Sequence, residues 1–141
     1  WDIEINNIRS FADQLLIVGL WSTVEQYLTR TLILAEKEKG NYNARIPYQW
    51  NGLKNYYSNI GVDISKCKGY NIVIECRILN NKIKHSGEVD SMLSKFENFK
   101  HLKGKPLTRI YFKLQNYSDA VYEFTGNVME LTDEILFKKN E

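Results

Sequence analysis

The chain has 141 residues, of which 43% are hydrophobic, 13% aromatic and 26% charged, and its formal net charge is +2. This composition excludes intrinsic disorder and a disulfide-dependent miniature, and the length predicts a single domain, 1–141, with a substantial core. A net charge this small does not by itself indicate a nucleic-acid-binding protein.

The N-terminal segment predicts a long helix over residues 3–38. Its apolar residues fall on one broad stripe that we expect to face the core, namely Ile8, Phe11, Leu15, Val18, Val24, Leu28, Leu32 and Ala35. The polar run EKEKGN, with Gly40, predicts where this helix ends. The longest apolar run, LLIVGLW at 15–21, is too short to span a bilayer and lacks the flanks of a signal peptide, so no membrane partner is expected.

Shorter helices are predicted in the middle of the chain. After Pro47, apolar residues recur at helical spacing up to Gly61: Trp50, Leu53, Tyr57 and Ile60. Asp63 or Ser65 is expected to cap a central helix that ends near His85.

Two boundaries follow this central helix. Gly87 is expected to close it, and Asp90 is expected to cap a further helix over SMLSKFENFKHL. The run NIVIEC inside the central helix is β-branched and could pass for a strand, but no second strand signal accompanies it. The helical interpretation is therefore preferred.

The C-terminal segment carries the clearest pattern. Apolar residues step alternately by three and four over most of its length: Leu107, Ile110, Leu114, Tyr117, Val121, Phe124, Val128, Leu131 and Ile135. This predicts one helix over 108–138, begun by Pro106 and Thr108. The predicted fold class is all-α, an up-and-down bundle of about five helices, two of them long.

Metal and cofactor chemistry is not indicated by the sequence. Cys67 and Cys76 lie nine residues apart outside any CxxC pair, and only two histidines occur, which argues against a zinc site. Phosphate-loop, dinucleotide-binding, zinc-protease and hydrolase signatures are missing. We expect no cofactor, two cysteines acting as small core residues, and a reduced, cytoplasmic protein.

The segment ECRILNNKIKHSGE, residues 75–88, concentrates polar chemistry on one predicted helix. Four apolar side chains form a stripe within about 60° of one another on a helical projection, namely Ile72, Cys76, Leu79 and Ile83. Six polar ones fall within roughly 140° on another side, namely Arg77, Asn80, Asn81, Lys84, His85 and Glu88. The wider stretch 77–105 has seven basic and three acidic residues, a net charge of +4.

This polar side has two interpretations. It is either a solvated face, with Asn81 bonding across the bundle and His85 bonding the last carbonyls, or a site facing RNA or a protein partner. His85 can move a proton at neutral pH, and Arg77 one or two turns away can hold a phosphate. These two groups suffice for metal-free RNA cleavage. His101, beside lysines near a predicted helix end, is a weaker candidate.

The run RILNNKIKHSG, following a helix that carries WSTVEQYLTR with Glu25 and Leu28, resembles the HEPN superfamily of small helical bundles. In that family an Arg followed by a polar residue precedes a His by four to six residues late in a helix. The resemblance implies a metal-independent endoribonuclease of bacterial defence or toxin–antitoxin systems. It also implies a homodimer whose two motifs face each other, paired around the central helix.

Carrying the motif onto this chain shows a departure. With His85 in the histidine place and a four-residue gap, Asn80 takes the arginine place and Asn81 the polar place. Arg77 has seven residues between it and His85, one beyond the family range. The expected catalytic residues are thus His85, Arg77 and Asn81, with Lys84 and Asn80 binding substrate. The alternative is a catalytically inactive dimerising, sensing or RNA-binding module of a larger defence protein, and an antitoxin is a further possible partner.

Overall fold

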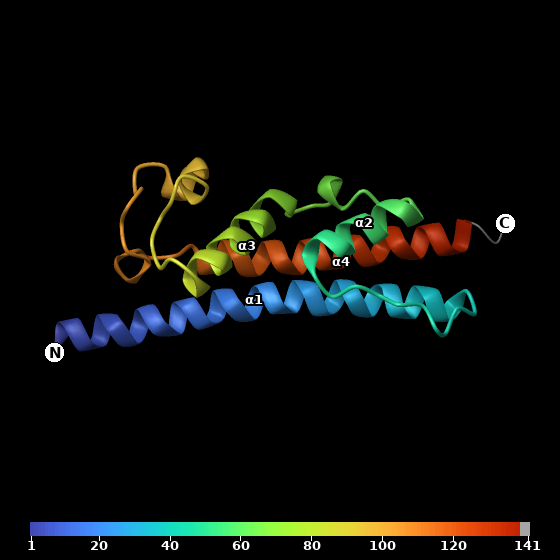
Figure 1. Ribbon diagram of the computed structural model, residues 1–141, viewed down its shortest axis with the longest axis horizontal. Helices are drawn as coiled ribbons and strands as arrows, with labels where there is room; N and C mark the ends of the chain where they lie inside the picture. The colour runs from blue at the N-terminus through green and yellow to red at the C-terminus, as the bar shows by residue number, and fades with distance from the viewer. Residues whose placement is uncertain (139–141) are drawn as a thin grey trace. The chain divides into compact units, whose positions relative to one another are not determined.

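The computed structural model describes residues 1–138, and this part of the chain is all-helical, as predicted (Figure 1). Four α-helices are present: α1 (Asp2–Glu38), α2 (Trp50–Ile60), α3 (Tyr70–Lys84) and α4 (Leu114–Lys138). Four single 3₁₀ turns accompany them: η1 (Ile64–Lys66), η2 (Leu93–Lys95), η3 (Glu97–Phe99) and η4 (Leu107–Arg109). Within residues 1–138 there is no strand, only an isolated antiparallel bridge between Glu88 and Pro106.

The chain divides into two compact units. Unit 1 comprises Trp1–Trp21 with Asn71–Ser118, and unit 2 comprises Ser22–Tyr70 with the chain from Asp119 onward. Residues 139–141 of the predicted domain 1–141 lie outside the described residues, and the single-domain organisation stays a prediction. No helix in residues 1–138 has the length and apolar character needed to cross a bilayer.

The core of unit 1 joins α1, α3 and the long connection between α3 and α4. Its buried members are Ile17, Cys76, Ile78, Leu79, Val89, Leu93, Phe99, Leu107, Ile110 and Tyr117. Half of them come from residues 85–113, a segment with no α-helix of its own. The connection is therefore an integral part of the packed core.

The helix predicted over residues 91–102 is wrong, although its predicted cap forms. The Asp90 carboxylate accepts hydrogen bonds from the backbone N–H groups of Met92 and Leu93, at 3.1 and 2.9 Å. The turn so started stops at Phe96, whose backbone is extended at φ −83° and ψ 142°. Two 3₁₀ turns replace the helix, and this backbone places both Leu93 and Phe99 in the core.

The two later helices begin after their predicted starts. Helix α4 begins at Leu114 instead of residue 108, because Ile110 is extended and reaches the core from outside a helix. Asp63 caps η1, not the central helix, by accepting from the Ser65 N–H at 3.1 Å. Helix α3 then starts after Gly69, at φ +75°, where a Cβ would stand 2.8 Å from the Ala120 carbonyl oxygen.

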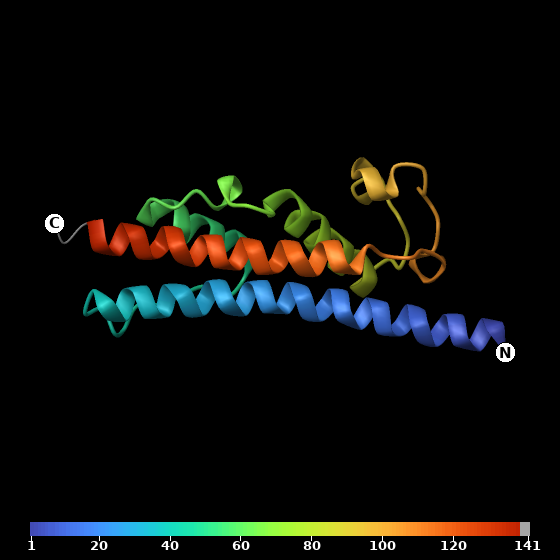
Figure 2. The ribbon, with the colours of Figure 1, turned by 180° about the vertical axis from the view of Figure 1, so that it is seen from behind.

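Unit 2 packs the second half of α1, α2 and most of α4 side by side (Figures 1 and 2). Its fully buried side chains include Val24, Leu28, Leu32, Leu53, Tyr57, Phe124 and Val128. The Tyr57 hydroxyl donates to the Leu28 carbonyl at 2.6 Å, which joins α2 to α1. Trp50, Tyr70 and Phe124 form a ring cluster with centroids 6.2–6.3 Å apart.

The predicted core stripe of the first helix holds only in its second part. Val24, Leu28, Leu32 and Ala35 are buried, as expected. Ile8, Phe11 and Leu15 were expected in the core and are exposed, at 70%, 66% and 55%. That part of the prediction is wrong: the helical pattern is present, but no element within residues 1–138 covers these three side chains.

Candidate functional site

The C-terminal half of α3 positions the polar residues singled out from the sequence. Lys84, Arg77, Asn81 and His85 project within about 100° of one another around the helix axis. Arg77 and Asn81 are half-buried, while Lys84 and His85 are exposed. The His85 N–H donates to the Asn81 carbonyl at 3.1 Å, so the helical path continues through His85.

The turn after His85 is fixed by backbone hydrogen bonds. The N–H groups of Ser86 and Gly87 donate to the Lys82 carbonyl at 3.1 and 2.7 Å, and Gly87 has φ +68°. Gly87 thus closes the helix as predicted. Its carbonyl accepts from the Leu107 N–H at 2.9 Å, and the Lys82 ammonium pairs with the Asp90 carboxylate. The segment that carries His85 is consequently anchored on both sides.

The cations on this side of α3 are available to a ligand. Within residues 1–138, the side chains of Arg77, Lys84 and His85 form no hydrogen bond or ion pair. Lys82, which points elsewhere around the helix, is engaged by Asp90. We name Arg77, Asn81, Lys84 and His85 together the α3 polar face.

Asn80 does not belong to this face. It is 2% exposed, and its Oδ1 has no hydrogen-bond donor in the described part of the chain. The expectation that Asn80 is accessible to substrate is wrong, because its side chain points about 60° from Arg77 toward the side of Cys76. The side chain in the family's arginine place is therefore neutral and enclosed.

A buried carboxylate in unit 1 was missed from the sequence. Glu75 is 6% exposed, and the Asn98 side-chain amide donates to its two oxygens at 3.4 and 3.1 Å. Burial first, and then the neighbouring Glu75, raise the pKa of Tyr117. No sequence signal marks Glu75, since its partner Asn98 is 23 residues away; the contact ties the connection to α3.

The other candidate groups have plainer surroundings. Burial raises the pKa of the Cys76 thiol to about 12, so Cys76 is a neutral core side chain at pH 7. Cys67 is also buried, and both cysteines are free. His101 is exposed and lies in the turn that follows η3, outside any helix. Within residues 1–138, no three His, Cys, Asp or Glu side chains gather in a way that could hold a metal.

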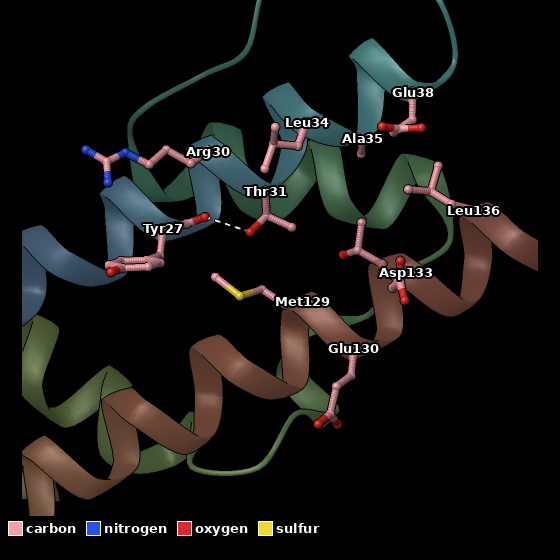
Figure 3. Close-up of a pocket in the computed structure, with 11 residues that line it drawn as sticks. Tyr27, Arg30, Thr31, Leu34, Ala35, Glu38, Met129, Glu130, Asp133 and Leu136 are labelled. Atoms are coloured by element: carbon pink, nitrogen blue, oxygen red, sulfur yellow. Dashed lines mark hydrogen bonds between the residues drawn. The ribbon is translucent and has the colours of Figure 1, made fainter.

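Unit 2 contains a separate groove of about 550 Å³ between α1 and α4 (Figure 3). Its floor is apolar and includes Leu34, Ala35, Met129 and Leu136. Charged side chains stand at its rim, namely Arg30, Glu38, Glu130 and Asp133. The one basic residue among three acidic ones makes this groove a poor match for a phosphodiester.

Comparison of the chain with protein-family models, with curated proteins and with solved structures found no match. The roles of the residues in the α3 polar face therefore rest on their own geometry and chemistry. That geometry combines one titratable imidazole, two unpaired cations and an amide along a single accessible side of a helix.

Proposed function

We propose that the protein is a metal-independent endoribonuclease whose site is the α3 polar face. The observation that carries the proposal is the exposed His85 on the same helix side as the unpaired Arg77 and Lys84. Unpaired cations beside a proton-transfer group are what phosphodiester cleavage requires when no metal takes part.

Each member of the face has a distinct task in this reaction. Neutral His85 takes the proton from a ribose 2′-OH, and that oxygen attacks the adjacent phosphorus. The bond from phosphorus to the 5′-oxygen breaks, and that oxygen takes a proton from the imidazolium. The products are a 2′,3′-cyclic phosphate and a 5′-hydroxyl. Arg77 and Lys84 offset charge on the phosphoryl oxygens, and Asn81 orients the phosphate by hydrogen bonding.

The two cations lie at different distances from His85 along α3. Arg77 and His85 are eight residues apart, which places their Cα atoms about 12 Å apart along the axis. Lys84 adjoins His85, so it is the nearer charge to the reacting phosphorus. In a homodimer whose two α3 faces meet, as the HEPN resemblance implies, Arg77 of one copy could also serve His85 of the other.

A second candidate function is favoured by the burial of Asn80. Because the family's arginine place holds an enclosed amide, the chain also fits an inactive HEPN-like module that binds RNA or pairs within a larger defence protein. The net charge of +4 over residues 77–105 would serve such binding without chemistry. An antitoxin that binds this chain is compatible with either function.

The first prediction tests cleavage directly. The whole chain is incubated with single-stranded RNA in EDTA, and products are analysed for cyclic phosphate ends. We expect His85→Ala to reduce the rate about 100-fold or more, as loss of a general base does. His101→Ala is the matched control, since it removes the other exposed histidine of unit 1, and it should cut as the wild type does.

The outcomes separate the two functions. Wild-type protein that binds RNA, with affinity falling as salt rises, yet leaves it intact supports the RNA-binding module. Equal cleavage by wild type and His85→Ala contradicts the assignment of His85. Lys84→Ala should lower the cleavage rate more than Arg77→Ala if a single copy forms the site.

A further inference from the structure

The first half of α1 exposes far more apolar surface than the rest of unit 1. Its exposed large hydrophobic side chains are Trp1, Ile3, Ile5, Ile8, Phe11, Leu15 and Leu16. In Figures 1 and 2 no other α-helix of the described part of unit 1 runs along the first turns of α1, although Tyr111, in the segment after η4, contacts Arg9. Apolar surface gathered on one element marks an interaction site.

Three of these residues, together with the exposed Ala12, follow a heptad. Ile5, Ile8, Ala12 and Leu15 are spaced by three, four and three residues, and all four are exposed. We call them the α1 seam. On the opposite side of the same helix, Ser10 and Ile17 are buried, at 2% and 0%. The helix thus uses one side for its own core and presents a second, coiled-coil side outward.

We propose that the α1 seam pairs with the seam of a second copy of this chain in a parallel two-stranded coiled coil. The seam places Ile5 and Ala12 at the a positions of two heptads and Ile8 and Leu15 at the d positions. Of these, the β-branched Ile5 at a and the leucine Leu15 at d are the choices that favour two parallel strands. With Trp1, Phe11 and Leu16 beside it, the seam offers six large exposed apolar side chains to one partner.

Flanking residues match in the parallel register. In such a pair, each residue that flanks the seam on one side meets the residue five positions later on the other copy. Glu4 then meets Arg9 of the second copy, and Phe11 meets Leu16 of the second copy. Within its own copy, Arg9 pairs with Asp13 at 2.6 Å and lies over the Tyr111 ring, with its guanidinium carbon 3.9 Å from the ring centroid. Glu4 of the second copy would add a second carboxylate to this guanidinium.

Charge argues against a lipid surface as the occupant. Residues 1–20 contain Asp2, Glu4 and Asp13 against Arg9, a net charge of −2. Helices that lie on membranes carry lysine and arginine on their polar side, which draws them to anionic headgroups. This stretch would be repelled, whereas a second copy offers the same seam and a matched pair of charges.

The test compares two isoleucines of α1 in the whole chain. Ile8 lies in the seam and is 70% exposed, while Ile3 lies off the seam and is 77% exposed. In sedimentation equilibrium over a dilution series, wild type and Ile3→Glu should form dimers, and Ile8→Glu should raise the dimer dissociation constant roughly 100-fold by placing two carboxylates in the seam. A monomeric wild type, or Ile8→Glu pairing as tightly as wild type, overturns the proposal.

Cross-linking tests the parallel register and does not depend on how Ile8→Glu folds. Ile5→Cys and Ala12→Cys, made separately, should each form an intermolecular disulfide under mild oxidation, because only a parallel in-register pair brings both positions together. Ile3→Cys should not, and the native Cys67 and Cys76 are buried. A disulfide at only one of the two seam positions overturns the parallel arrangement. RNA cleavage is not measured, so the result stands whether or not the protein is a nuclease.

Discussion

The two halves of α1 have similar apolar periodicity, but the apolar side chains of one half are buried and those of the other half are exposed. Residues 22–38 bury Val24, Leu28 and Leu32 in unit 2, whereas residues 2–16 expose Ile8 and Leu15. Both halves are continuous helix. The difference shows that a stripe of apolar residues determines which side chains share a helix face, while the covering partner comes from elsewhere in the chain or from another chain.

The largest effect expected from this difference is in stability. Leu32→Ala removes a side chain that is 0% exposed and should cost about 2–5 kcal/mol of unfolding free energy. Leu15→Ala, the same substitution in the other half of α1, should change it by about 0.5 kcal/mol or less in the monomer. Urea unfolding under dilute conditions measures both. Equal losses would mean that the first half of α1 is covered in solution even when the chain is monomeric.

Alkaline unfolding should depend on a tyrosine bonded to the buried half. Burial raises the pKa of Tyr57, whose hydroxyl donates to Leu28. Above pH 10 the unfolded chain loses the tyrosine proton and the folded chain keeps it, so stability is full below pH 10 and falls as pH rises, by up to about 1.4 kcal/mol per pH unit. Tyr57→Phe should reduce this fall and leave the part that the buried Tyr117 contributes. Tyr27→Phe, at an exposed position of α1, should not.

The smallest effect concerns an ion pair in the exposed half. Asp13→Asn weakens the contact with Arg9, four residues earlier, and should cost less than about 1 kcal/mol because the pair is partly solvated. The loss should shrink further in high salt. Thermal unfolding at two salt concentrations measures it. A cost that does not change with salt would indicate that Arg9 acts through its packing on Tyr111 instead.

Much of the fold was predictable because helical periodicity depends only on local spacing. The all-α class, the two long helices and the closure of α3 at Gly87 followed from repeats of three and four and from glycine positions. Leu107 and Ile110 continued the repeat of α4 but lie outside it. An apolar side chain can be buried from a turn or from an extended segment as well as from a helix, so the repeat alone did not locate the start of α4.

The sequence predicted which helix face carries the candidate site, but it did not predict every residue of that face correctly. The projection placed Arg77, Asn81, Lys84 and His85 on one accessible side, where the structure has them. It could not show that Asn80, 60° away, is enclosed, because that depends on neighbours distant in sequence. The same dependence hid Glu75, whose environment is set by Asn98 and Tyr117.

The anchored turn after α3 has a consequence for any ligand that meets His85. The residues that follow it are held by Lys82 carbonyl bonds on one side and by the Gly87–Leu107 bond on the other. A side chain on a free loop tip loses conformational entropy when a ligand fixes it, and that loss weakens binding. The backbone at His85 has already lost this freedom during folding, so a ligand that binds here has to order only the rotamer of the exposed imidazole.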